Sequence, residues 1–89
     1  MTTKEIKRQM YADSRIKTKC NQDEWARLFN LGAQKGQQNV STKESGVRSV
    51  NMPEAFASQL LMFIHQKGYD VKNIEFNEDG YIANISKRQ

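Results

Sequence analysis

Hydrophobic residues recur at helical spacing along most of the chain and switch to alternation near its C-terminal end. A first helix is predicted over residues 4–14, where Ile6 and Met10 share one face and Thr3 can cap the start. Residues 15–21 lack this pattern and are predicted to form a connection or a frayed last turn of this helix. The chain therefore opens with a short amphipathic helix.

A second helix is predicted to begin at Asn21, because Asn21 and Glu24 have the spacing of a capping box. Asn30 and Gly32 tolerate a positive φ angle, so we expect the helix to stop there. Its apolar face carries Trp25, Leu28 and Phe29. We expect Trp25 to belong to the core and not to a platform for base stacking.

A third, shorter helix is predicted over residues 37–45, after a turn at residues 33–36. Val40 is its one clear core position, and Gly46 is its expected stop. Glu44, near its end, is predicted to pair with Arg8 or Arg15 inside the domain.

The strongest helical pattern follows the single proline. Residues 47–51 are expected to be extended, because the residue before a proline is biased away from the helical region. Pro53 suits the first position of a fourth helix, which Gly68 should end. The wide apolar face of this helix comprises Phe56, Ala57, Leu60, Leu61, Phe63 and Ile64.

Hydrophobic and polar residues alternate in the last part of the chain. Strands are predicted within residues 72–76 and 81–85, joined by a hairpin turn at residues 77–80. The predicted fold is mainly α, with four short helices followed by a C-terminal β-hairpin. A chain of 89 residues has room for one domain, here a helical head over residues 1–68 and a hairpin tail over residues 69–89.

Charge is distributed unevenly along the chain, whose formal net charge is +4. Residues 1–50 contain ten Lys and Arg against five Asp and Glu, a balance of +5, whereas residues 51–89 contain four against five, a balance of −1. A basic half joined to a nearly neutral half fits a head that binds a polyanion, and it equally fits a solvated charged surface.

Catalysis and membrane insertion have little support in the sequence. The single His65 and the single Cys20 lie far apart, without a catalytic motif around them. His65 falls in the last turn of the fourth helix, where a cation would favour the helix dipole. We expect no enzyme activity, cofactor or metal. No apolar run is long enough to span a bilayer, and a lone cysteine suits the reducing cytoplasm.

Two segments together resemble a known DNA-binding motif. Residues 22–31, with Gln22, Ala26 and Asn30 four apart, resemble the first half of the helix-turn-helix in the Cro/phage-repressor (XRE) family. Residues 36–46 resemble its recognition helix and end in the acid-x-Gly pattern of Glu44 and Gly46. Counting the flanking helices, the resemblance covers about residues 3–64.

Two features depart from the family pattern. The stretch between Asn30 and Asn39 is about four residues longer than usual, so that the third helix starts earlier or a loop protrudes. Lys43 occupies a position that is normally apolar or aromatic. Residues 69–89 have no counterpart in the resemblance.

The resemblance implies a repressor or autoregulator that reads a double-stranded DNA operator, from a phage or another mobile element. Glutamine and asparagine amides present a donor beside an acceptor, which suits the N6/N7 edge of adenine in the major groove. Base contacts are predicted for Gln37, Gln38, Asn39, Ser41 and Thr42. Phosphate contacts are predicted for Gln22, Lys35, Lys43 and Arg48.

Alternatives stay open for the partner. The same scaffold fits a small inhibitor that binds a host protein, and the basic head fits an RNA-binding regulator. A homodimer is expected, with the hairpin of residues 69–89 pairing with its counterpart through an unpaired strand edge. The hairpin alternatively only covers its own domain.

Overall fold

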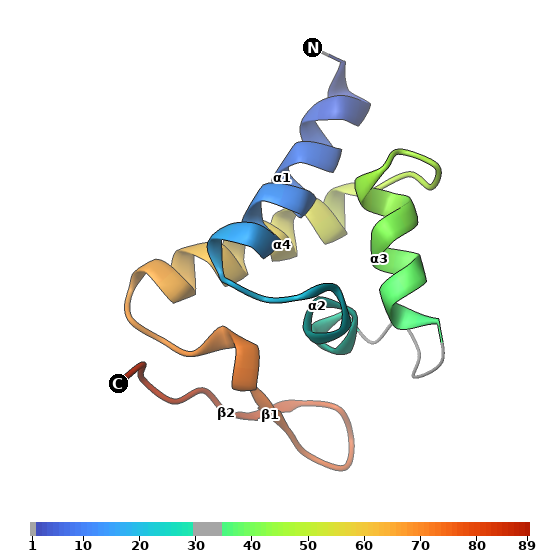
Figure 1. Cartoon of the computed structure of the whole chain (residues 1–89). Helices are drawn as coiled ribbons and strands as arrows, with labels where there is room; N and C mark the ends of the chain where they lie inside the picture. The colour runs from blue at the N-terminus through green and yellow to red at the C-terminus, as the bar shows by residue number, and fades with distance from the viewer. Residues whose placement is uncertain (1, 30–34) are drawn as a thin grey trace.

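The computed structural model describes residues 2–29 and 35–89 of the chain. This part is mainly helical and ends in a small antiparallel hairpin (Figure 1), which confirms the predicted fold class at that level. In chain order the elements are α1 (Thr3–Lys17), α2 (Gln22–Leu28), α3 (Gly36–Glu44), α4 (Met52–Gln66), the 3₁₀ helix η1 (Val71–Asn73), β1 (Glu75–Phe76) and β2 (Ile82–Asn84). α1 packs mainly against α4, and α2 mainly against α3.

Side-chain caps fix where three of the helices begin. Asn21 and Glu24 form the predicted capping box at α2. A second capping box, formed by Asn51 and Glu54, opens α4. At α1 the cap is Thr2 and not Thr3, because the Thr2 hydroxyl accepts a hydrogen bond from the Glu5 amide and Thr3 is already helical.

Two helix boundaries differ from the prediction. α1 continues to Lys17 instead of ending near Ser14, and the connection shrinks to residues 18–21. The Thr18 hydroxyl bonds the Ser14 carbonyl, which supports this additional turn, and Lys19 then ends it with a φ of 60°. α3 begins at Gly36, one residue early.

The predicted stop signals are partly described. Gly46 follows α3 with a φ of 86°, a conformation that favours glycine. α2 ends at Leu28 with Phe29 as its C-cap. Asn30 and Gly32, the predicted stop residues, lie outside the described residues, as do residues 33 and 34 of the turn predicted at residues 33–36.

The core lies where α1, α2, α3 and α4 meet. Tyr11, Trp25 and Phe29 form an aromatic cluster whose ring centroids lie 5.2–6.1 Å apart. Trp25 is fully buried, so its predicted place in the core is confirmed. Val40, the predicted core residue of α3, is also fully buried. The other buried apolar members of this cluster are Cys20, Ala26, Val50 and Ala55.

The tail is less regular than predicted. Residues 71–73 form η1, so the expected strand at residues 72–76 is wrong over its first half. Val71 and Ile74 are both buried, and a segment that turns two side chains inward three residues apart follows helical spacing. The predicted turn is confirmed, because the Asn77 amide bonds the Tyr81 carbonyl and Gly80 takes a φ of 86°.

Backbone and side-chain bonds hold the tail against the helical head. The Arg27 side chain of α2 donates to the carbonyls of Lys72 and Ile74. Near the C-terminus, the Arg88 amide bonds the Gly68 carbonyl. Within the described parts of the chain, no helix is both long and apolar enough to cross a membrane.

Candidate nucleic-acid interface

α3 lies unusually close to α2 at its first turn. A Cβ atom built on Gly36 would lie 2.7 Å from the Cβ of Ala26, nearer than side chains normally approach. Both residues are buried. The small residue predicted at position 26 therefore does let two helices meet, and Gly36 is the residue that meets it.

The far end of α3 is fixed by Glu44. Its carboxylate accepts hydrogen bonds from the Arg15 guanidinium of α1 (Nε–Oε2 2.5 Å) and from the Gln22 amide of α2 (Nε2–Oε1 3.0 Å). The Arg8 guanidinium donates to the Glu44 backbone carbonyl. The predicted pairing of Glu44 is thus confirmed with Arg15, whereas Arg8 bonds only the backbone. The Glu44 side chain ties three helices together.

Fixing α3 at both ends leaves one face of it open to solvent. Gln37, Gln38 and Ser41 are exposed on this face. Asn39 and Thr42 are half-buried, and the Thr42 hydroxyl donates to the Asn39 carbonyl. Of the five predicted base-contacting residues, the structure therefore presents three outward and places two at the border of the face.

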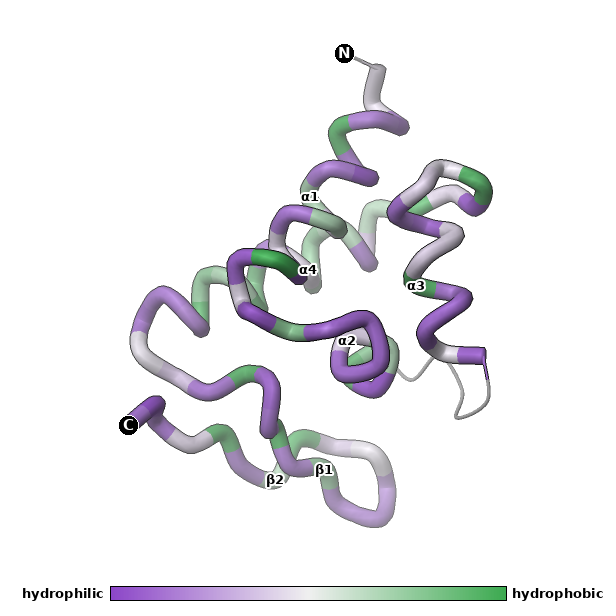
Figure 2. The backbone as a smooth tube through the Cα atoms, in the orientation of Figure 1, coloured by the Kyte–Doolittle hydropathy of each residue, from purple (hydrophilic) through white to green (hydrophobic). Residues whose placement is uncertain are grey.

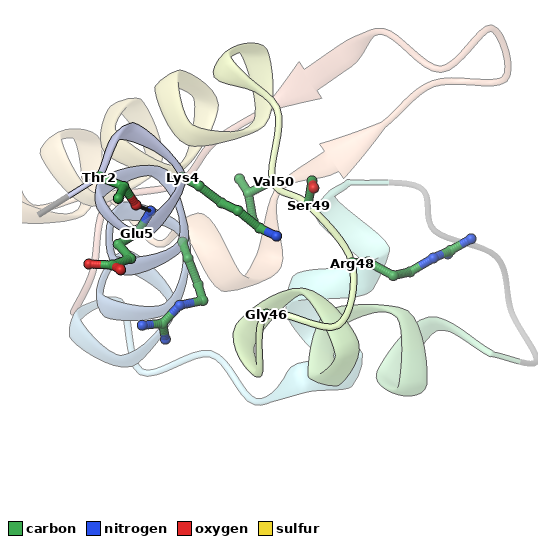
Figure 3. Close-up of a pocket in the computed structure, with 8 residues that line it drawn as sticks. Thr2, Lys4, Glu5, Gly46, Arg48, Ser49 and Val50 are labelled. Carbon is green, nitrogen blue, oxygen red and sulfur yellow. Dashed lines mark hydrogen bonds between the residues drawn. The ribbon is translucent and has the colours of Figure 1, made fainter.

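Arg48 and Lys35 flank this face. Lys35 is the exposed N-cap residue of α3. Arg48 follows α3, its amide donates to the Thr42 carbonyl, and its guanidinium donates to Asn39 (Nη1–Oδ1 3.3 Å). In Figure 3 the Arg48 side chain extends outward from the loop that carries it. Both residues are exposed beside the solvent-facing side of α3.

Gln22 joins α2 to both ends of α3. While its amide nitrogen donates to Glu44, its oxygen accepts a weak hydrogen bond from the Gln37 amide (3.4 Å). The side chain is half-buried. The position of Gln22 fits a residue that orients Gln37. To contact a phosphate, the Gln22 side chain would have to give up its hydrogen bonds to Glu44 and Gln37.

Lys43 is turned inward and is paired within the domain. Its ammonium bonds the Glu54 carboxylate of α4 and lies 5.9 Å from the centre of the Tyr11 ring. Only 12% of its side chain is exposed. Lys43 thus lies on the inner side of α3, and a phosphate contact would need its ammonium to leave these partners.

A basic pocket of about 240 Å³ lies between the start of α1 and the loop that follows α3 (Figure 3). Lys4, Arg8 and Arg48 line it together with the single carboxylate of Glu5. Lys4 and Arg8 were not among the predicted site residues. Their spacing of four places them on one face of α1, but their nearness to the loop depends on how α1 crosses α3.

The pKa values of Cys20 and His65 are both shifted by their surroundings. Cys20 is buried, and burial raises the pKa of its thiol, which disfavours the reactive thiolate. Burial, followed by Arg88 and Lys19, lowers the pKa of His65. This shift disfavours the charged imidazolium, while the predicted place of His65 in the last turn of α4 is confirmed.

A comparison with protein-family models, curated proteins and solved structures finds no match to the chain.

Proposed function

We propose that the protein is a sequence-specific regulator that binds a double-stranded DNA operator through α3. The observation that carries this proposal is the face of α3 itself: its two ends are anchored, and Gln37, Gln38 and Ser41 point to solvent from its first two turns. A rigid helix with exposed amides at its N-terminal end suits the major groove. Such a regulator would act in the cytoplasm.

The half-buried and basic neighbours complete the proposed interface. Gln22 orients Gln37, and Asn39 orients Arg48 through the hydrogen bonds described above. Positive charge beside the exposed face of α3 comes from Lys35 and Arg48. Lys4 and Arg8 add positive charge in the pocket next to the loop that carries Arg48. Contacts from cations to phosphates fix the register of a protein on DNA without reading its sequence.

Replacing Gln37 or Gln38 by alanine is expected to weaken binding to a preferred duplex by about 2 kcal/mol, because an amide that bonds both groups of an adenine edge is lost. Binding to unrelated duplexes should change little. The preferred duplex is first selected from a random pool, and affinity is then measured by fluorescence anisotropy. Gln66→Ala, an exposed glutamine on α4, is the matched control.

Equal losses on preferred and unrelated DNA would show that these glutamines do not read bases. Binding to RNA but to no DNA duplex would favour an RNA-binding regulator. Absence of binding to either nucleic acid would favour the protein-binding inhibitor.

Charge reversal of Arg48 or Lys35 to glutamate is expected to weaken binding to all duplexes together, because these residues are assigned to phosphates. Affinity should fall by about 0.9 log units per log unit of salt for each phosphate neutralised, and each reversal should make this dependence shallower. Lys87→Glu, in the exposed tail, serves as the control. Unchanged salt dependence in both reversed variants would remove Lys35 and Arg48 from the interface.

A further inference from the structure

The outer face of α4 carries a stripe of large apolar side chains that the other described parts of the chain leave largely exposed. Met52, Phe56, Leu60 and Phe63 are 54, 59, 45 and 54% exposed. Their spacing of four, four and three residues places them on one side of the helix. Figure 2 shows the hydrophobic residues that run along α4. The inner side of the helix packs on α1, so the residues of this stripe are not part of the core.

The hairpin adjoins this stripe but does not cover it. Ile82 of β2 is itself 58% exposed. Between α2, α4 and the hairpin lies an apolar pocket of about 240 Å³, lined among others by Leu60, Ile74 and Ile82. A second apolar pocket of about 230 Å³ lies further along α4, between Phe63 and Ile85. The face therefore combines projecting aromatic side chains with apolar hollows beside them.

We propose that this face, formed by the α4 stripe and Ile82, is the interface of a two-fold homodimer. In a two-fold dimer the same patch meets itself, so it must contain both the projections and the hollows that receive them. Phe56 and Phe63 are such projections, and the pockets beside Leu60 and Phe63 are such hollows. A second copy of the chain supplies both features at once.

The area of the face agrees with this occupant. A large apolar side chain presents roughly 200 Å², so five that are about half exposed present roughly 500 Å² on each copy. This lies in the upper part of the range for the largest apolar patch of a monomer, about 300–600 Å², and such a patch often has a binding function. Pairing two copies would bury roughly 1,000 Å² from these side chains alone, the lower bound of a specific interface.

The strand edge of the hairpin offers a smaller contact between two copies than the α4 stripe does. β1 has two residues and β2 has three, so an edge-to-edge pair would add few backbone hydrogen bonds. The α4 stripe spans twelve residues, from Met52 to Phe63. This inference stands apart from nucleic-acid binding, although a dimer would present two copies of α3 to one duplex.

Sedimentation of the full chain tests the proposal. The wild-type protein should sediment at about twice its 10.3 kDa mass at about 100 µM and dissociate on dilution. Leu60→Glu and Phe56→Glu should each weaken the dimer by roughly 100-fold, because an unpaired carboxylate would be buried in an apolar interface. Ile16→Glu, at a comparably exposed apolar position on α1, should remain dimeric.

Fluorescence of the buried Trp25 checks that each variant is folded. A wild-type chain that stays monomeric at this concentration overturns the proposal, as does a dimer that persists in both α4 variants. DNA binding measured in parallel separates the two proposals. A monomer that binds DNA refutes only the dimer, and a dimer that ignores DNA refutes only the proposed function.

Discussion

Replacing Glu44 by alanine is expected to lower the free energy of unfolding by about 3 kcal/mol. The carboxylate accepts hydrogen bonds from Arg15 and Gln22, and the side chains of Arg15 and Glu44 are only 18 and 14% exposed. Removing it would leave a largely buried guanidinium without its counter-charge. The loss should fall at the lower end of the range for buried pairs, because both groups keep some solvent contact.

Chemical denaturation measures this loss, and two variants bracket it. Glu44→Gln keeps a hydrogen-bond acceptor without the charge and should cost about half as much. Glu78→Ala, an exposed acid in the hairpin turn, should stay within about 0.5 kcal/mol of the wild type. A loss at Glu44 no larger than that at Glu78 would show that this side chain does not tie the helices together.

The elements that could be predicted from the sequence are those whose signals are local. The capping box of Asn21 and Glu24 and the positive φ of Gly46 depend on residues a few positions apart. The same local logic applies to Asn51 and Glu54, whose spacing also matches a capping box. Pro53 marks the start of the same helix, so two local signals agree on this boundary.

The tail could not be predicted in detail, because its conformation depends on contacts with distant segments. Ile74 and Phe76 alternate with polar residues, as in a strand. In the structure Ile74 is buried and its carbonyl accepts from Arg27 of α2, forty-seven residues earlier. This hydrogen bond favours a 3₁₀ turn before the strand begins. No residue near Ile74 in the sequence predicts the contact with Arg27.

In the candidate site, too, features set by local sequence spacing could be predicted, and features set by contacts between helices could not. Gln37, Gln38 and Ser41 are exposed because Val40 and Gly36 define the buried side of α3, a pattern that helical spacing reveals. Whether a lysine faces solvent depends instead on its partners. Lys43 is turned inward by Glu54 and Tyr11, and both lie on other helices.

Replacing Gly36 by valine is expected to lower the free energy of unfolding by about 3 kcal/mol, because the added side chain overpacks the contact between α2 and α3. A Cβ at this position would lie 2.7 Å from the Cβ of Ala26, and the two further methyl groups of valine enlarge the clash. The first turn of α3 would have to move away from α2. Gln37 and Gln38 follow directly, so the proposed operator binding should weaken as well.

A second substitution tests whether Ala26 is the obstacle. Ala26→Gly alone should cost about 1 kcal/mol through helix propensity. Combined with Gly36→Val it should restore part of the lost stability, so that the double variant is more stable than the sum of the two losses predicts. Ser41→Val, the same kind of side chain on the exposed face of α3, should cost far less. Additive losses in the double variant would mean that α3 is positioned by Glu44 and the core, and not by its contact with Ala26.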